Sequence, residues 1–76
     1  MSKLALCTSK QMCKIVEKCG FYKVRQKGSH LSYSNNHGGY TVVPMHTGDL
    51  KRGLIRNIIN DIGITTDEYE RLKKDV

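Results

Sequence analysis

The residues with the greatest capacity for chemistry form one short segment, Arg25-Gln26-Lys27-Gly28-Ser29-His30. Its two cations can neutralise a phosphate, and its glycine lets backbone amides approach that phosphate without an intervening side chain. An imidazole ordinarily titrates near neutral pH, so His30 can take a proton from a ribose 2′-hydroxyl or give one to a leaving 5′-oxygen. The segment therefore predicts phosphate binding and acid–base chemistry on RNA. The alternative is that His30 is an ordinary surface residue at the head of a strand.

The other two histidines are weaker candidates. His46 follows the apolar stretch 42–45 and could pair with His30 in acid–base cleavage, but a structural role in a loop is the favoured interpretation. His37 lies among asparagines and glycines and is expected to be solvated. Because a whole strand separates His37 from His46, the sequence predicts no metal site, and nothing in it implies a cofactor.

Positive charge is concentrated in the first half of the chain. The 76 residues carry a net charge of +6, and residues 1–34 hold seven Lys or Arg residues against one acid, Glu17. A one-sided field of this kind favours a polyanionic partner, most often nucleic acid. Scattered, solvated lysines are the alternative. The predicted RNA-binding residues are Lys23, Arg25, Lys27, Gly28 and Ser29.

The elements that must position these residues begin with a helix. Apolar residues at i, i+3, i+4 and i+7 predict a helix over residues 9–19, capped by Thr8 or Ser9 and ended by Gly20. These apolar residues are Met12, Ile15, Val16 and Cys19. The spacing of apolar residues then changes to two, which predicts strands over 21–26, 31–34 and 40–43.

Turn residues separate the three predicted strands and make them an antiparallel meander. Gly28 lies in the first turn, residues 35–39 form the second, and Pro44 ends the last strand. Helical spacing returns over residues 54–62 and ends at Gly63, and the capping box of residues 65–68 opens a short last helix that runs to about Lys74. A chain this short supports one core, so we expect a two-layer α+β sandwich with the helices on one sheet face and the other face open.

Cysteines and tyrosines leave alternatives open. Cys7, Cys13 and Cys19 are expected to be free thiols, with Cys19 in the core, rather than zinc ligands or disulfide partners. The predicted strands carry three tyrosines that could either stack on unpaired bases or pack in the sheet. These are Tyr22, Tyr33 and Tyr40. The short apolar run at residues 4–7 suits neither a signal peptide nor a membrane span, so a cytoplasmic protein is expected.

Several motifs occur in a recognisable order across residues 8–70. They are Gly20-Phe21, the segment 25–30, residues 42–46, Asp49-Leu50, residues 53–59 and Gly63-Ile64-Thr65. In order and spacing they resemble the HicA (YcfA-like) toxin family. The resemblance implies a single domain over residues 1–76 with the fold of double-stranded-RNA-binding domains, in the order α-β-β-β-α, and a short extra C-terminal helix. Lys51, Arg52 and Leu54 depart from the family pattern, so the start of the second helix is left open.

The family consists of mRNA interferases of type II toxin–antitoxin modules, held inactive by a HicB antitoxin. The resemblance therefore implies an endoribonuclease that cleaves mRNA without a metal, and the family's catalytic histidine in its Gly-Ser-His motif corresponds to His30. The implied partners are RNA and a HicB-type antitoxin, with no membrane. Two alternatives stay open: a non-catalytic double-stranded-RNA-binding module, and a degenerate toxin that acts only through its antitoxin complex.

Overall fold

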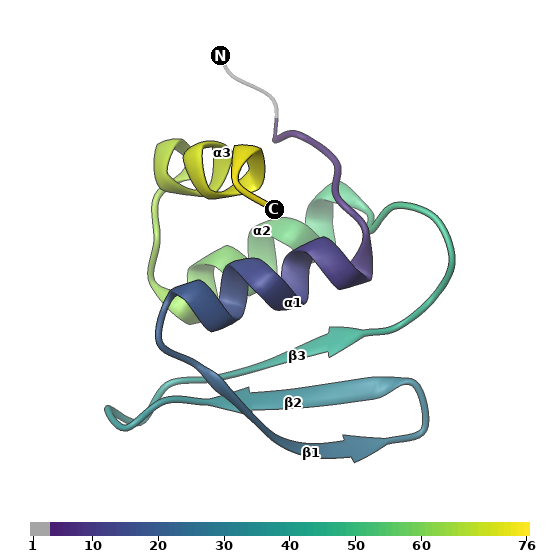
Figure 1. The fold of residues 1–76 in the computed structure, drawn as a ribbon, viewed down its shortest axis with the longest axis vertical. Coiled ribbons are helices and arrows are strands. Elements are labelled where there is room, and N and C mark those ends of the chain that lie inside the picture. Colours follow the sequence, from purple (N-terminus) through teal and green to yellow (C-terminus); the bar gives the residue numbers. More distant parts are fainter. Residues whose placement is uncertain (1–3) are drawn as a thin grey trace.

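The computed structural model describes residues 4–76 as one helix, three strands and two further helices (Figure 1). The elements are α1 (Ser9–Lys18), β1 (Tyr22–Lys27), β2 (His30–Ser34), β3 (Tyr40–Pro44), α2 (Arg52–Ile62) and α3 (Thr66–Lys74). All three strands belong to one antiparallel sheet in the order β1-β2-β3. The predicted α+β fold, with its α-β-β-β-α order and extra C-terminal helix, is confirmed.

Helices α1 and α2 lie on the same side of the sheet, and both contact β3 (Figure 1). Helix α3 packs against α1 on the side away from the strands, next to the segment that leads into α1. Strand β1 is the strand farthest from the helices, and all six of its residues are exposed. Within residues 4–76, no helix has the length and apolar character needed to cross a bilayer.

Local signals fix most of the element boundaries. Thr8 caps α1 in a capping box with Gln11, and Thr65 caps α3 in a capping box with Glu68. Gly63 ends α2 with a φ of 76°, a left-handed conformation that suits glycine. Each box satisfies orphan amides in a first turn, so these helices begin where the sequence predicts.

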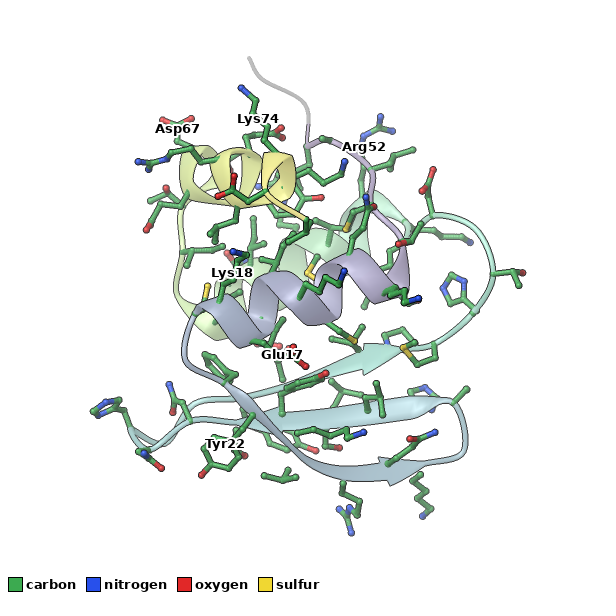
Figure 2. The ribbon with its side chains drawn as sticks, viewed as in Figure 1. Glu17, Lys18, Tyr22, Arg52, Asp67 and Lys74 are labelled. Atoms are coloured by element: carbon green, nitrogen blue, oxygen red, sulfur yellow. The ribbon has the colours of Figure 1, made fainter. Side chains whose placement is uncertain are left out.

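Most elements differ from their predicted ranges by one or two residues at an end, and two of these differences matter here. Helix α2 begins at Arg52, two residues before the predicted residue 54. The apolar pattern misses this start because Arg52 and Gly53 are exposed and not apolar. The guanidinium Nε of Arg52 donates a hydrogen bond to the carbonyl of Leu4 at 3.1 Å, which ties this end of α2 to the N-terminal segment (Figure 2). Strand β2 begins at His30, so this histidine lies in the sheet ladder.

The core fills the space between the sheet and the two helices that cover it. Its members come from all layers: Met12, Ile15 and Val16 of α1, Leu31 and Val43 of the sheet, and Ile55, Ile58 and Ile59 of α2. Two polar contacts cross the same space. The Tyr33 hydroxyl donates to Oε2 of Glu17 at 3.0 Å (Figure 2), and the Thr41 hydroxyl donates to Oδ2 of Asp61 at 3.0 Å. Together they fix the helices over β2 and β3.

The three cysteines are free thiols, as predicted, but their burial differs from the prediction. Cys7 and Cys13 are buried, whereas Cys19 packs against the core and stays partly exposed. The buried stripe of α1 includes Cys13 because α1 has neighbours on two sides, the sheet and α3. Burial raises the pKa of all three thiols above the ordinary value of 9.0.

Stability should therefore fall in alkaline solution. Burial also raises the pKa of Tyr33 and Tyr69 above its ordinary value of 10.0, so the unfolded chain releases these thiol and phenol protons at a lower pH than the folded chain. The stabilisation is complete below about pH 9 and is lost as the pH rises beyond it. We expect the urea midpoint to drop between pH 8 and pH 10.5. The Cys7→Ala/Cys13→Ala double variant should show a shallower drop, and a midpoint that rises with pH would contradict the assignment.

Candidate nucleic-acid interface

The sheet face that no helix covers carries three rows of residues, and each row contains one residue from each of the three strands. The rows are Lys27–His30–Pro44, Arg25–Ser32–Val42 and Tyr22–Ser34–Tyr40. Directly paired residues of antiparallel strands point to the same face, and the intervening residues of β2 and β3 are buried on the helix side. We call these nine residues the open face. They include two permanent cations and no carboxylate, which suits an anionic ligand.

Part of the open face is hollowed. A depression of about 550 Å³ is lined by Arg25, Lys27, Gly28, Ser29, His30, Ser32, Tyr40 and Val42. The structure thus brings together His30 and four of the five predicted RNA-binding residues. Ser32 and Val42 were not predicted, although both lie at even spacing from residues that were, which is the signal for a shared sheet face.

A two-residue turn positions His30. Gly28 has a φ of 59°, which the first central position of such a hairpin turn favours, and Lys27 pairs with His30 across the turn. The carbonyl of Ser29 accepts a hydrogen bond from the Met45 amide, so the turn is held against the chain that leaves β3. The exposed imidazole of His30 is therefore carried by a backbone paired on both sides.

Lys23 does not join the other predicted residues. Spacing by two along β1 places Lys23, Arg25 and Lys27 on one face, but the pairing shifts between Lys23 and Arg25, so that Lys23 pairs with Tyr33. Tyr33 is buried on the helix side, so Lys23 lies on that side as well. This β-bulge leaves Val24 unpaired, so the side chains of β1 before the bulge point to the opposite face from the one that spacing by two predicts. Lys23 therefore lies on the opposite side of the sheet from Arg25 and Lys27, the cations with which it was predicted to bind RNA.

The two other histidines lie apart from the depression. His46 is in the loop between β3 and α2, where its Nδ1 is 3.1 Å from the carbonyl oxygen of Thr47 and its amide donates to the buried hydroxyl of Ser9. His37 is exposed in the turn between β2 and β3, which the Asn35 side chain organises by accepting from two backbone amides. Across the described part of the chain, no three His, Cys, Asp or Glu side chains gather as a metal site.

Fold and site together define a small basic α+β protein of the double-stranded-RNA-binding order, with a histidine and two cations around a hollow on its open sheet face. The family model described as the HicA toxin of bacterial toxin–antitoxin systems matches residues 9–64. The chain belongs to the HicA toxin family, and a toxin of such a pair implies an antitoxin partner. A comparison with curated protein sequences gives no match.

Proposed function

We propose that this toxin is an endoribonuclease that cleaves mRNA through His30 and is neutralised by a HicB-type antitoxin. The observation that carries the proposal is the depression itself, in which an exposed imidazole lies with Arg25, Lys27 and the Gly28 turn. Membership of a family of mRNA interferases supports the same conclusion. Lys23, on the other face, is not part of the proposed site.

The proposed reaction is attack of a ribose 2′-oxygen on the adjacent phosphorus. The 2′-O–P bond forms, the P–O5′ bond breaks, and the products end in a 2′,3′-cyclic phosphate and a 5′-hydroxyl. His30 transfers a proton as general base or general acid. Arg25 and Lys27 stabilise the charge that develops on the phosphate oxygens, together with the backbone of Gly28 and Ser29. None of these roles requires a metal.

Incubation of the purified protein with a long single-stranded transcript tests this proposal. We expect cleavage that persists when EDTA chelates divalent ions, with cyclic phosphate at the new 3′ ends. Binding without cleavage would instead favour a non-catalytic RNA-binding module. A toxin that neither binds nor cleaves RNA, but still forms an antitoxin complex, would be a degenerate member.

Neutralisation is proposed to work by covering the open face. An open face with two cations and no carboxylate calls for an acidic antitoxin surface, because complementary charge stabilises and orients such complexes. Addition of the antitoxin should then suppress cleavage and protect His30 from chemical modification. A complex that forms while cleavage continues at the free rate would contradict this arrangement.

The two lysines of β1 provide a matched test of the RNA-binding surface. Lys27 lies at the depression and Lys23 on the helix side, on the same strand and with the same side chain. Each phosphate contact contributes about 0.7 to the slope of log affinity against log salt for a single strand. We expect Lys27→Ala to weaken RNA binding and flatten the slope by about that amount, and Lys23→Ala to leave the slope unchanged. Equal changes of the salt slope in both variants would show that the bulge does not determine which of the two lysines contacts the RNA phosphates.

A further inference from the structure

Two exposed tyrosines lie on the open face, and neither is required by the proposed acid–base chemistry. Tyr22 is 47% exposed and Tyr40 is 51% exposed, and they flank Ser34 in the same row. The third strand tyrosine, Tyr33, is 2% exposed and hydrogen-bonded to Glu17 beneath the helices. The sheet has therefore placed one tyrosine in the core and left two aromatic rings on the surface that carries His30.

Hydrogen bonds direct the two exposed rings differently. The Tyr22 hydroxyl donates to Oδ1 of Asn36 in the turn after β2, at 3.2 Å (Figure 2). The Tyr40 hydroxyl donates to the Ser32 hydroxyl at 3.1 Å, which is one row nearer to His30. Tyr40 lines the depression and Tyr22 does not. The ring of Tyr40 thus leans along the sheet toward the histidine.

Burial supports the same placement. Ser32 lies on the open face but is only 9% exposed, although no helix covers that side. The hydrogen bond from Tyr40 places the end of the tyrosine side chain against Ser32, while half of the tyrosine stays in solvent. Neighbouring rows of a sheet are about 7 Å apart along the strands. The Tyr40 hydroxyl therefore reaches the row of Arg25 and Ser32, which is adjacent to the row of His30 and Lys27.

We propose that Tyr40 is the stacking platform for one unpaired base of the substrate, next to the phosphate that His30 acts on. This inference rests on the proposed function and names its substrate class as single-stranded RNA. Aromatic side chains on an open sheet stack on splayed bases, and stacking tolerates any sequence because every base has a π-face. A base that is paired and stacked within a duplex does not offer that face. Tyr40 is thus a positioning residue that selects unpaired nucleotides.

The test measures binding rather than cleavage. The probe is a fluorescently labelled 12-nucleotide 2′-O-methyl RNA, used as a single strand and as a duplex with its complement, because the methyl group removes the attacking hydroxyl. Wild-type protein should bind the single strand more tightly than the duplex. Tyr40→Ala should weaken single-strand binding by about 5- to 150-fold, the loss expected for one stacked base. The same variant should change duplex binding less than about 2-fold, because phosphate contacts remain.

Two further variants separate stacking from a structural role. Tyr40→Phe keeps the ring and should stay within a few-fold of wild type on the single strand, while Tyr22→Ala removes an equally exposed tyrosine and should have the smaller effect. Circular dichroism of each variant confirms the fold. The proposal is overturned if Tyr40→Ala binds the single strand normally, if it weakens both probes equally, or if Tyr22→Ala causes the same loss. Selective single-strand binding by a protein that cleaves no transcript would refute the nuclease proposal and leave the platform standing.

Discussion

His30→Ala should reduce the rate of RNA cleavage by 10²- to 10⁴-fold and abolish growth arrest in cells that express the protein. The size of this effect is that of a single general acid–base residue. His30 is exposed and its backbone is paired through main-chain atoms, so the loss of its imidazole leaves the ladder and the core in place. The measurement is the initial rate of cleavage of a labelled transcript, at equal protein concentration.

The other histidines provide matched controls for this variant. His37→Ala and His46→Ala remove imidazoles that lie outside the depression, and each should cost much less than His30→Ala. Circular dichroism and the thermal midpoint of each variant should match the wild-type values, and antitoxin binding should persist. Wild-type cleavage by a folded His30→Ala protein would refute the proposed mechanism.

Ile58→Ala should reduce the same activity for a different reason, by destabilising the fold. Ile58 is 1% exposed in the core cluster, on the face of α2 that contains its buried residues. Removing a buried Ile side chain to Ala costs about 2–5 kcal/mol. Small domains have total stabilities of about 5–15 kcal/mol and tend toward the lower end. Urea denaturation should therefore show a free energy of unfolding lowered by about 2–5 kcal/mol, and cellular toxicity should fall with it.

A neighbouring residue of α2 controls for the substitution itself. Asn57 is exposed, so Asn57→Ala should change the free energy of unfolding by less than about 0.5 kcal/mol. If Ile58→Ala retained the wild-type urea midpoint, this site would not belong to the stabilising core. The pair Ile58→Ala and His30→Ala also separates two ways of losing toxicity, because only the first should alter the urea midpoint.

The sequence alone determined the order of elements and placed most of their ends to within one residue. Capping boxes at Thr8 and Thr65, the left-handed Gly63 and the turn at Gly28 act within a few residues, so their effect can be read from neighbouring residues. The position of His30 opposite Lys27 is likewise local, because the two residues flank one two-residue turn. The alternation of β2 and β3 also separated a buried face from an open one.

Only the tertiary structure decided which side chains share the open face. The bulge at Val24 depends on how β1 pairs with β2, and it moves Lys23 to the helix side against the pattern of the sequence. Tyr33 and Tyr40 both lie in strands, but Tyr33 points to the helix side and is buried beneath α1, whereas Tyr40 points to the open face and lines the depression with His30. The start of α2 and the burial of Cys13 depend likewise on contacts between segments distant in the chain, which no local pattern encodes.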